Sequence, residues 1–202
     1  RDVAPSRGLG DVYKRQVFFL ARILGALYFI NNIDDKDLVA RSRRSLIGNS
    51  VLFLVFFLSF VIRTLLADGY AVNPETGEVF MEPYKYLTNF LEMPLVLVLF
   101  LIGVVLVLFG IGKSLLKTKF DKGIWFTGIG TVLAVLALLL VAGYNNTAYY
   151  PSTNDLQSSL TLANSCSSQF TLRVMFYVSF LVPFVLAYIF YAWRSIDIHK
   201  IS

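Results

Sequence analysis

The chain has 202 residues, of which 56% are hydrophobic and 15% are charged. A soluble domain of this length has about 25% charged and about 45–50% apolar residues. The composition, with its apolar residues gathered in long blocks, excludes an ordinary soluble domain and predicts an integral membrane protein. The net charge of +5 indicates a basic cytoplasmic face rather than nucleic-acid binding, because the basic residues fall between the apolar blocks.

The first apolar segment, Val17–Ile30, has 14 residues and contains Arg22. A helix needs about 20 apolar residues to cross the hydrocarbon core, so this segment is too short. The polar residues 1–16 before it lack the features of a signal peptide. Their last six residues resemble extraneous translated sequence found at the ends of environmental gene fragments. We therefore expect residues 1–16 to be a non-native leader and 17–30 to be a truncated span of a longer protein.

Four later segments are long enough to cross a bilayer: residues 46–66, 93–112, 123–144 and 174–193. They are apolar all round rather than alternating in polarity, which predicts helices and not barrel strands. Pro94 is expected to begin its helix, and Pro183 is expected to kink the last one. The predicted fold of residues 17–202 is an all-α, polytopic transmembrane helical bundle with four complete spans and one truncated span.

The charges of the connecting loops predict the orientation. Residues 31–45, residues 113–122 and the tail after residue 193 are basic, whereas residues 67–92 and 145–173 hold few basic residues. Positive loops stay in the cytoplasm. The C-terminus is therefore expected to be cytoplasmic, and loops 67–92 and 145–173 are expected to lie outside. The acidic residues 34, 35 and 37 are expected to form a solvated loop that can begin the next helix.

Residues that could carry chemistry are scarce. His199 is the single histidine and is expected to lie in a solvated tail, and Cys166 is the single cysteine. A haem or metal site needs paired ligands, so no catalytic, cofactor-binding or metal-ligating residues are assigned. Arg22 is the clearest ionisable residue within membrane depth, which makes it either a functional group or a snorkelling side chain.

The loop of residues 145–171 is rich in Ser, Thr and Asn but also holds Tyr149, Tyr150, Leu160 and Leu162. Structureless loops of this length are usually functional or packed against something. We therefore expect this loop to pack on the outer surface of a partner protein.

Several stretches of the chain resemble subunit II of cytochrome bd quinol oxidases. The most specific are Tyr144–Thr153, Ser158–Leu162 and Asn164–Ser165, and the match continues through Ser167–Ser168, Phe170–Leu172, Val174–Met175, Pro183, Leu186, Tyr188 and Trp193. Gly25–Tyr28 leading to Ala40–Arg44 is similar to the cytoplasmic loop before that family's fifth helix. The resemblance extends from about Val17 to Ser202.

The resemblance implies an eight-helix subunit, of which this chain would hold the end of helix four and helices five to eight. It implies a bacterial cytoplasmic (inner) membrane protein with periplasmic loops at 67–92 and 145–173. The partner would be the oxidase subunit I, which carries the haems, oxidises quinol and reduces oxygen to water. This chain would be a non-haem, structural subunit of that quinol:oxygen oxidoreductase, binding no cofactor itself and contacting membrane lipid but no nucleic acid.

A fragment of a secondary transporter, or of another multi-pass membrane protein, is the alternative. A transporter would call for interrupted helices with polar groups at the bilayer midplane or for an inverted repeat. The spans are nearly pure aliphatic and Phe, with only Ser59, Thr127, Thr131 and Ser179 as polar interruptions. The sequence therefore favours the oxidase subunit.

Overall fold

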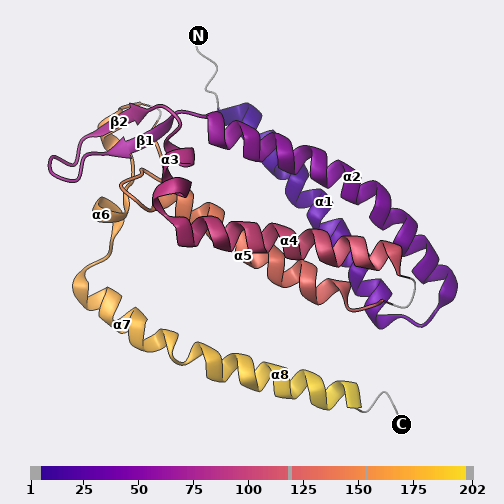
Figure 1. The fold of residues 1–202 in the computed structure, drawn as a ribbon. Helices are drawn as coiled ribbons and strands as arrows, with labels where there is room; N and C mark the ends of the chain where they lie inside the picture. The colour runs from indigo at the N-terminus through magenta and orange to yellow at the C-terminus, as the bar shows by residue number, and fades with distance from the viewer. Residues whose placement is uncertain (1–5, 118–119, 153, 199–202) are drawn as a thin grey trace. The chain divides into compact units, whose positions relative to one another are not determined.

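The computed structural model describes residues 6–117, 120–152 and 154–198, and its ribbon is drawn in Figure 1. The chain divides into two compact units, Arg1–Leu162 and Ala163–Ser202, and each is described by itself. The prediction for His199 lies outside the described residues, as does the part of the proposed leader in residues 1–5.

Helices α1 (Ser6–Asn32) and α2 (Lys36–Leu66) form an antiparallel pair. Helix α1 begins at Ser6 and not at Val17, because residues 6–16 contain no proline and consist largely of residues that a helix tolerates. A helical backbone does not distinguish native from foreign sequence, so the leader stays a prediction. Helix α2 starts as expected from the acidic loop: the Asp35 carboxylate accepts hydrogen bonds from the N–H groups of Asp37 and Leu38 at 2.8 and 3.2 Å.

Helices α4 (Pro94–Leu116) and α5 (Gly123–Gly143) form the second antiparallel pair. Their bounds agree with the predicted spans, and Pro94 occupies the first turn of α4, where its missing N–H costs nothing. Within the described residues, four helical stretches are long and apolar enough to cross a membrane: Lys36–Leu66, Pro94–Leu116, Gly123–Gly143 and Gln169–Ser195. The predicted all-α polytopic membrane fold is confirmed.

The α4–α5 contact is built on glycines. A Cβ added to Gly103 would lie 2.6 Å from the backbone N of Ala134, and one added to Gly130 would lie 2.6 Å from the backbone O of Gly103. Gly110 likewise faces Thr127 and Gly123. The two backbones therefore approach more closely than side chains would permit, as small residues allow in membrane helices.

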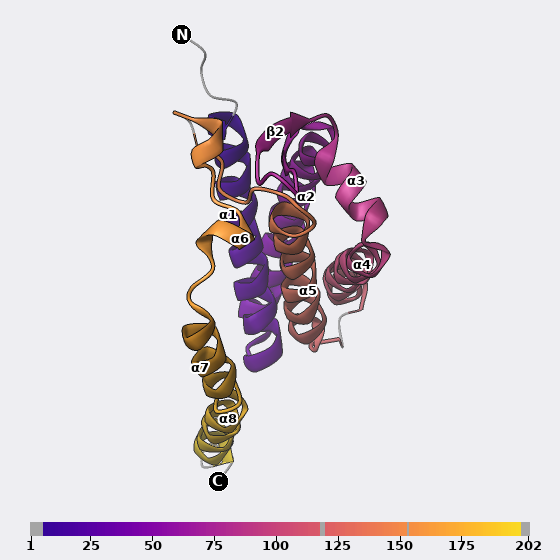
Figure 2. The same ribbon diagram turned by 90° about the vertical axis from the view of Figure 1, so that its left-hand side faces the viewer.

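The two helix pairs lie side by side (Figure 2) and share an apolar core. Leu27 of α1, Leu46 of α2 and Ala137 of α5 are fully buried. The ring of Phe100 on α4 lies 6.3 Å from that of Phe57 on α2 and 5.3 Å from that of Phe90. The outward faces carry many exposed Leu, Val, Ile and Phe side chains, as expected where lipid is the solvent.

At one end of the first unit, the two loops predicted to lie outside fold together. Strands β1 (Gly69–Val72) and β2 (Val79–Glu82) form an antiparallel hairpin, followed by α3 (Lys85–Glu92). The later loop contributes residues 144–161, including the short 3₁₀ helix η1 (Leu156–Ser158). Residues 67–92 and 144–161 together are called the cap.

The second unit contains the last apolar segment, in helices α7 (Gln169–Ser179) and α8 (Val182–Ile198), after the short α6 (Leu162–Ser165). The helix is interrupted at Phe180–Leu181, just before Pro183. Proline has no N–H to donate to the carbonyl four residues earlier, and its ring clashes there. The kink predicted at Pro183 is therefore present.

Candidate functional site

Asn89 of α3 is the polar centre of the cap and is fully buried. Its amide nitrogen donates to the Val141 carbonyl at the end of α5, at 2.9 Å, and to the Thr147 hydroxyl at 2.8 Å. Its carbonyl oxygen accepts from the Asn145 amide at 3.1 Å. The Asn145 amide also donates to the Glu92 carboxylate. One buried side chain thus joins both outer loops to a membrane helix.

The turn after α5 needs an unusual backbone. Asn145 and Asn146 both have positive φ, at 57° and 52°. Asparagine tolerates the left-handed region better than most residues do. The turn directs residues 146–148 along the free edge of β1, where the Val72 N–H donates to the Asn146 carbonyl and the Ala148 N–H to the Tyr70 carbonyl, each at 2.8 Å.

The opposite edge of the hairpin is covered by a side chain. The Val79 N–H donates to the Gln157 Oε1 at 2.9 Å, and the Gln157 Nε2 donates to the Val79 carbonyl at 3.0 Å. This amide side chain reproduces the pair of bonds that another strand would make. Both edges are therefore occupied by the later loop.

The sequence interpretation expected this later loop to pack on a partner's surface, and the structure shows that part of the loop also packs within the chain's own cap. Thr147, Ala148, Ser159 and Thr161 are buried in the chain's own cap. Exposed apolar side chains of the loop include Tyr149, Tyr150, Leu160 and Leu162.

Lys85 and Tyr86 pack at the base of the cap. The Lys85 ammonium lies 3.2 Å from the Glu82 carboxylate, although the Lys85 side chain is nearly buried. A Cβ on Gly69 would lie 2.5 Å from the Lys85 Cβ, so Gly69 leaves the space that this contact needs. Burial raises the pKa of the Tyr86 hydroxyl, and the nearby Tyr70 raises that pKa further.

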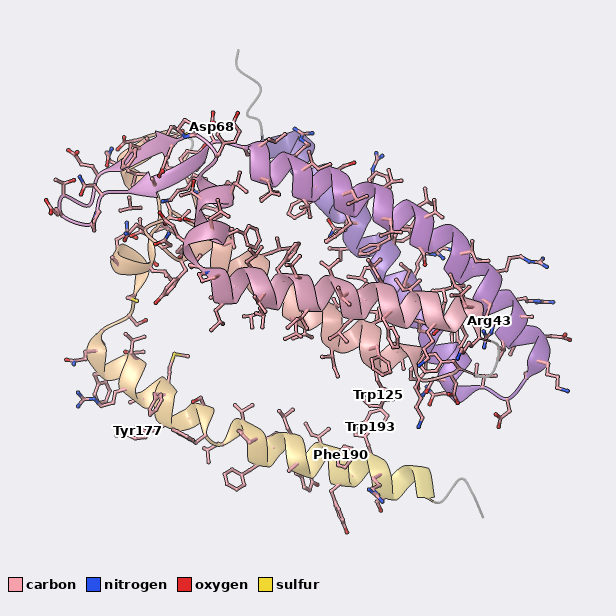
Figure 3. The ribbon with its side chains drawn as sticks, viewed as in Figure 1. Arg43, Asp68, Trp125, Tyr177, Phe190 and Trp193 are labelled. Carbon is pink, nitrogen blue, oxygen red and sulfur yellow. The ribbon has the colours of Figure 1, made fainter. Side chains whose placement is uncertain are left out.

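The end of the first unit opposite the cap is basic. Figure 3 shows Asp68 and Arg43 at the two ends of this unit. The Arg43 guanidinium donates to the carbonyls of Ser114 and Lys117 at 2.5 and 3.1 Å, at the C-terminus of α4. A cation there also interacts favourably with the helix dipole. The Lys113 ammonium lies 4.8 and 4.6 Å from the ring centres of Phe109 and Phe120.

Arg22 lies on the outer surface of α1, with its guanidinium 5.7 Å from the ring centre of Phe18. It lines an open groove between α1 and α2 together with Arg41. The structure thus brings this predicted intramembrane arginine beside a second one that the sequence interpretation had placed in a loop.

Ligands for a haem or a metal ion are not gathered in the described part of the chain. No group of three or more His, Cys, Asp or Glu residues there could hold a metal ion. The sulfur-bearing residues of that part, Met81, Met93, Cys166 and Met175, belong to different segments.

The sequence analysis missed the Asn89 centre and the Gln157 contact. A partial signal existed for the hairpin, since Asn73-Pro74 and Gly77 mark a turn between two short apolar runs. Gly77 has a φ of 74° and the Asn73 carboxamide accepts from the Glu75 N–H. Contacts between loops more than fifty residues apart leave no such local signal.

Comparison with known proteins agrees with this architecture. The sequence model of the family described as cytochrome bd terminal oxidase subunit II matches residues 15–196. The chain is also similar to the cytochrome bd-I ubiquinol oxidase subunit 2 of Escherichia coli strain K12 and of E. coli O157:H7, each with 32% identity over 131 residues. The match covers 64% of this chain and 33% of each relative, so it spans about a third of the length of these relatives.

The matched region contains the two helix pairs, the cap and the interrupted last helix. It includes α1 from residue 15 onward and nearly all of α8. A transporter is not favoured by this result. The chain belongs to the cytochrome bd terminal oxidase subunit II family.

Proposed function

We propose that this chain is part of the non-haem membrane subunit of a cytochrome bd quinol oxidase in the aerobic respiratory chain. The observation that carries the proposal is the family match across residues 15–196. In this proposal, subunit I oxidises quinol, reduces oxygen to water and binds the haems. The described residues of this chain contribute a membrane scaffold and a folded cap, and no redox step is assigned to them.

The distribution of donor groups supports placing the haems on the partner. In the described ranges, ionisable side chains lie mainly at the helix ends and in the cap, and they form no metal-binding group. Buried ligand clusters, such as those that bundles use for cofactors, are not seen among these residues. The subunit would therefore act through assembly and stability of the complex.

The orientation follows from charge. The α1–α2 and α4–α5 connections lie at the end of the first unit that is away from the cap (Figure 1). Residues 36–44, at the start of α2, and residues 113–122, from the end of α4 to the start of α5, hold four Lys or Arg residues each, whereas the cap holds few basic residues. Under the positive-inside rule, we place the cap in the periplasm and the C-terminus in the cytoplasm of a bacterial inner membrane.

Exposed aromatic side chains on the cap and exposed apolar faces on the helices both support an obligate partner. Tyr149 and Tyr150 are 43% and 67% exposed on the cap, where no lipid tails cover them in the proposed orientation. Tyrosine is enriched at protein interfaces because it offers a large apolar ring with a polar tip. We assign this surface to the periplasmic face of subunit I. Lipid and subunit I would cover the apolar faces of the helices.

Co-purification tests the proposal. The tagged full-length subunit that contains this chain is expressed together with a subunit I from the same organism, and the purified material is assayed for subunit I, for haem absorption and for quinol oxidation. We expect all three in the same fraction. Recovery of the folded subunit with neither subunit I nor haem absorption would contradict the proposal.

The cap surface is tested with paired variants. Tyr149→Ser together with Tyr150→Ser should lower the yield of co-purified subunit I, because two exposed aromatic contacts are lost. Glu75→Ser is the matched control, since Glu75 is also exposed but lies in the hairpin turn away from these tyrosines. Equal yields from the two proteins would show that this surface does not contact subunit I.

A further inference from the structure

An open groove of about 380 Å³ lies between α1 and α2, at the basic end of the first unit. Helix α1 contributes Arg22, Gly25 and Phe29, and helix α2 contributes Arg41, Ser42 and Ser45. The spacing of the α1 residues, with intervals of three and four, places them on one face of the helix. Two guanidinium groups and two hydroxyl groups therefore border one depression of the surface.

In the part of the chain that the structure describes, no acidic side chain lies within ion-pair distance of Arg22 or Arg41, although Asp37 stands one helical turn before Arg41 on α2. The ion pair that the described residues form joins Lys85 to Glu82, and both of these residues lie in the cap and not in the groove. Arg22 contacts the ring of Phe18, and Arg41 is exposed. The next arginine, Arg43, shows the contrast, because it donates to two backbone carbonyls. The groove is thus a site that can take an anion from outside the chain.

The length of α2 fixes the depth of the groove in the membrane. Its 31 residues extend over roughly 46 Å, which exceeds the hydrocarbon thickness of about 30 Å. The uncharged stretch begins at Leu46, so the first part of α2 lies beyond the hydrocarbon, among the lipid headgroups. Ser45 immediately precedes this stretch and lines the groove with Arg22. Arg22 therefore lies at headgroup level and not in the bilayer interior.

We propose that this groove binds the phosphate group of an anionic membrane phospholipid. Guanidinium groups bind phosphate oxygens through paired, charge-assisted hydrogen bonds, and the hydroxyl groups of Ser42 and Ser45 add donors. The Phe29 side chain is 50% exposed and gives the groove an apolar wall for the start of an acyl chain. Basic pockets between helices on the cytoplasmic side are suited to such headgroups.

Lipid retention provides the test. The full-length subunit, purified in its complex, is placed in nanodiscs of phosphatidylglycerol and phosphatidylcholine, and the phosphatidylglycerol retained by the subunit is counted by native mass spectrometry. Arg22→Gln with Arg41→Gln should reduce retention at least about tenfold, since two charge-assisted contacts are lost. Arg44→Gln, an exposed arginine of α2 outside the groove lining, should retain the lipid. Unchanged retention in the double variant would overturn the proposal.

A second variant closes the groove without removing charge. A Cβ on Gly25 would meet no heavy atom within 4 Å, so Gly25→Leu should fold and fill the groove, with the same loss of lipid. Normal retention in this variant would also count against the site.

Inorganic phosphate distinguishes a headgroup from a free ion. Excess phosphate should leave the phosphatidylglycerol bound, whereas its complete displacement would assign the groove to free phosphate. Retention is read on the tagged full-length subunit whether or not subunit I is present in the purified sample, so a failure to co-purify with subunit I would contradict the proposed function without affecting this result.

Discussion

Asn89 is fully buried between α3, the end of α5 and Thr147, and its amide nitrogen has two hydrogen-bond acceptors within the chain. Buried amides of this kind are costly to leave unsatisfied. Substitution of Asn89 tests how much this buried amide stabilises the cap. Substitution of Tyr86, a partly buried residue of the cap, tests how the stability of the cap depends on pH.

Asn89→Ala should destabilise the cap by about 1–3 kcal/mol, because the Asn145 amide and the Thr147 hydroxyl lose a buried partner. Amide hydrogen exchange at residues 144–150 should accelerate, and the apparent Tm of the purified complex should fall. Thr88→Ala is the neighbouring control, since the Thr88 hydroxyl bonds only to the Tyr84 carbonyl of its own helix among the described contacts. A cap with unchanged exchange in Asn89→Ala would refute the role of this residue.

The partly buried Tyr86 hydroxyl should make the stability of the cap depend on pH in the alkaline range. Burial raises the pKa of Tyr86 above its unfolded value of about 10. Its contribution to stability is fully present below that unfolded pKa and is lost as pH rises through the folded pKa. Thermal unfolding at a series of alkaline pH values should therefore show less loss of stability in Tyr86→Phe than in the natural chain. Tyr84→Phe, at an exposed position, should behave like the natural chain.

At the scale of elements, hydropathy predicts the membrane helices but not the fold of the cap. Residues 93–112 and 123–144 were expected as spans and occur as Pro94–Leu116 and Gly123–Gly143. Apolar length suffices there because a backbone in lipid must satisfy its hydrogen bonds within the helix. The cap has no such requirement, and its fold depends on pairs such as Asn89 with Val141. A single sequence carries no signal for pairs so distant, and for the same reason the groove between α1 and α2 was not foreseen.

The α4–α5 contact can be tested with glycines of the same helix. Gly103→Ala should destabilise the pair by about 1–3 kcal/mol, as overpacking does, because its Cβ would lie 2.6 Å from the Ala134 nitrogen. Gly112→Ala meets nothing within 4 Å and should be neutral or slightly stabilising, since alanine favours helix. Unfolding measured by steric trapping in bicelles compares the two. Equal stabilities would show that the close approach is not required.

At the scale of the whole molecule, the first unit has a polar, folded cap at one end and a cluster of Lys and Arg residues, including Arg43, at the other. The second unit carries a largely apolar helical segment, Gln169–Ser195, that is interrupted before Pro183. Neither distribution suits a protein surrounded by water. Both suit a chain that crosses a membrane, with the two ends of its helices on opposite sides.

Thiol labelling in whole cells checks the orientation. In a Cys166→Ser background, Glu75→Cys in the cap should react with a membrane-impermeant maleimide in cells with a permeable outer membrane. Lys36→Cys, at the start of α2, should react only after the inner membrane is opened. Both positions are exposed, so accessibility within the protein is matched. The reverse pattern would place the cap in the cytoplasm.

The two-point contact of Gln157 with Val79 has a consequence for the order of biogenesis. The hairpin at residues 69–82 is synthesised before α4 and α5, yet both of its edges are completed by residues 146–157. Until α5 has threaded through the bilayer, the hairpin presents unpaired edges of the kind that recruit foreign strands. The cap can therefore close only after the α4–α5 pair has been inserted into the membrane. A nascent chain arrested before residue 145 would therefore expose both edges of the hairpin.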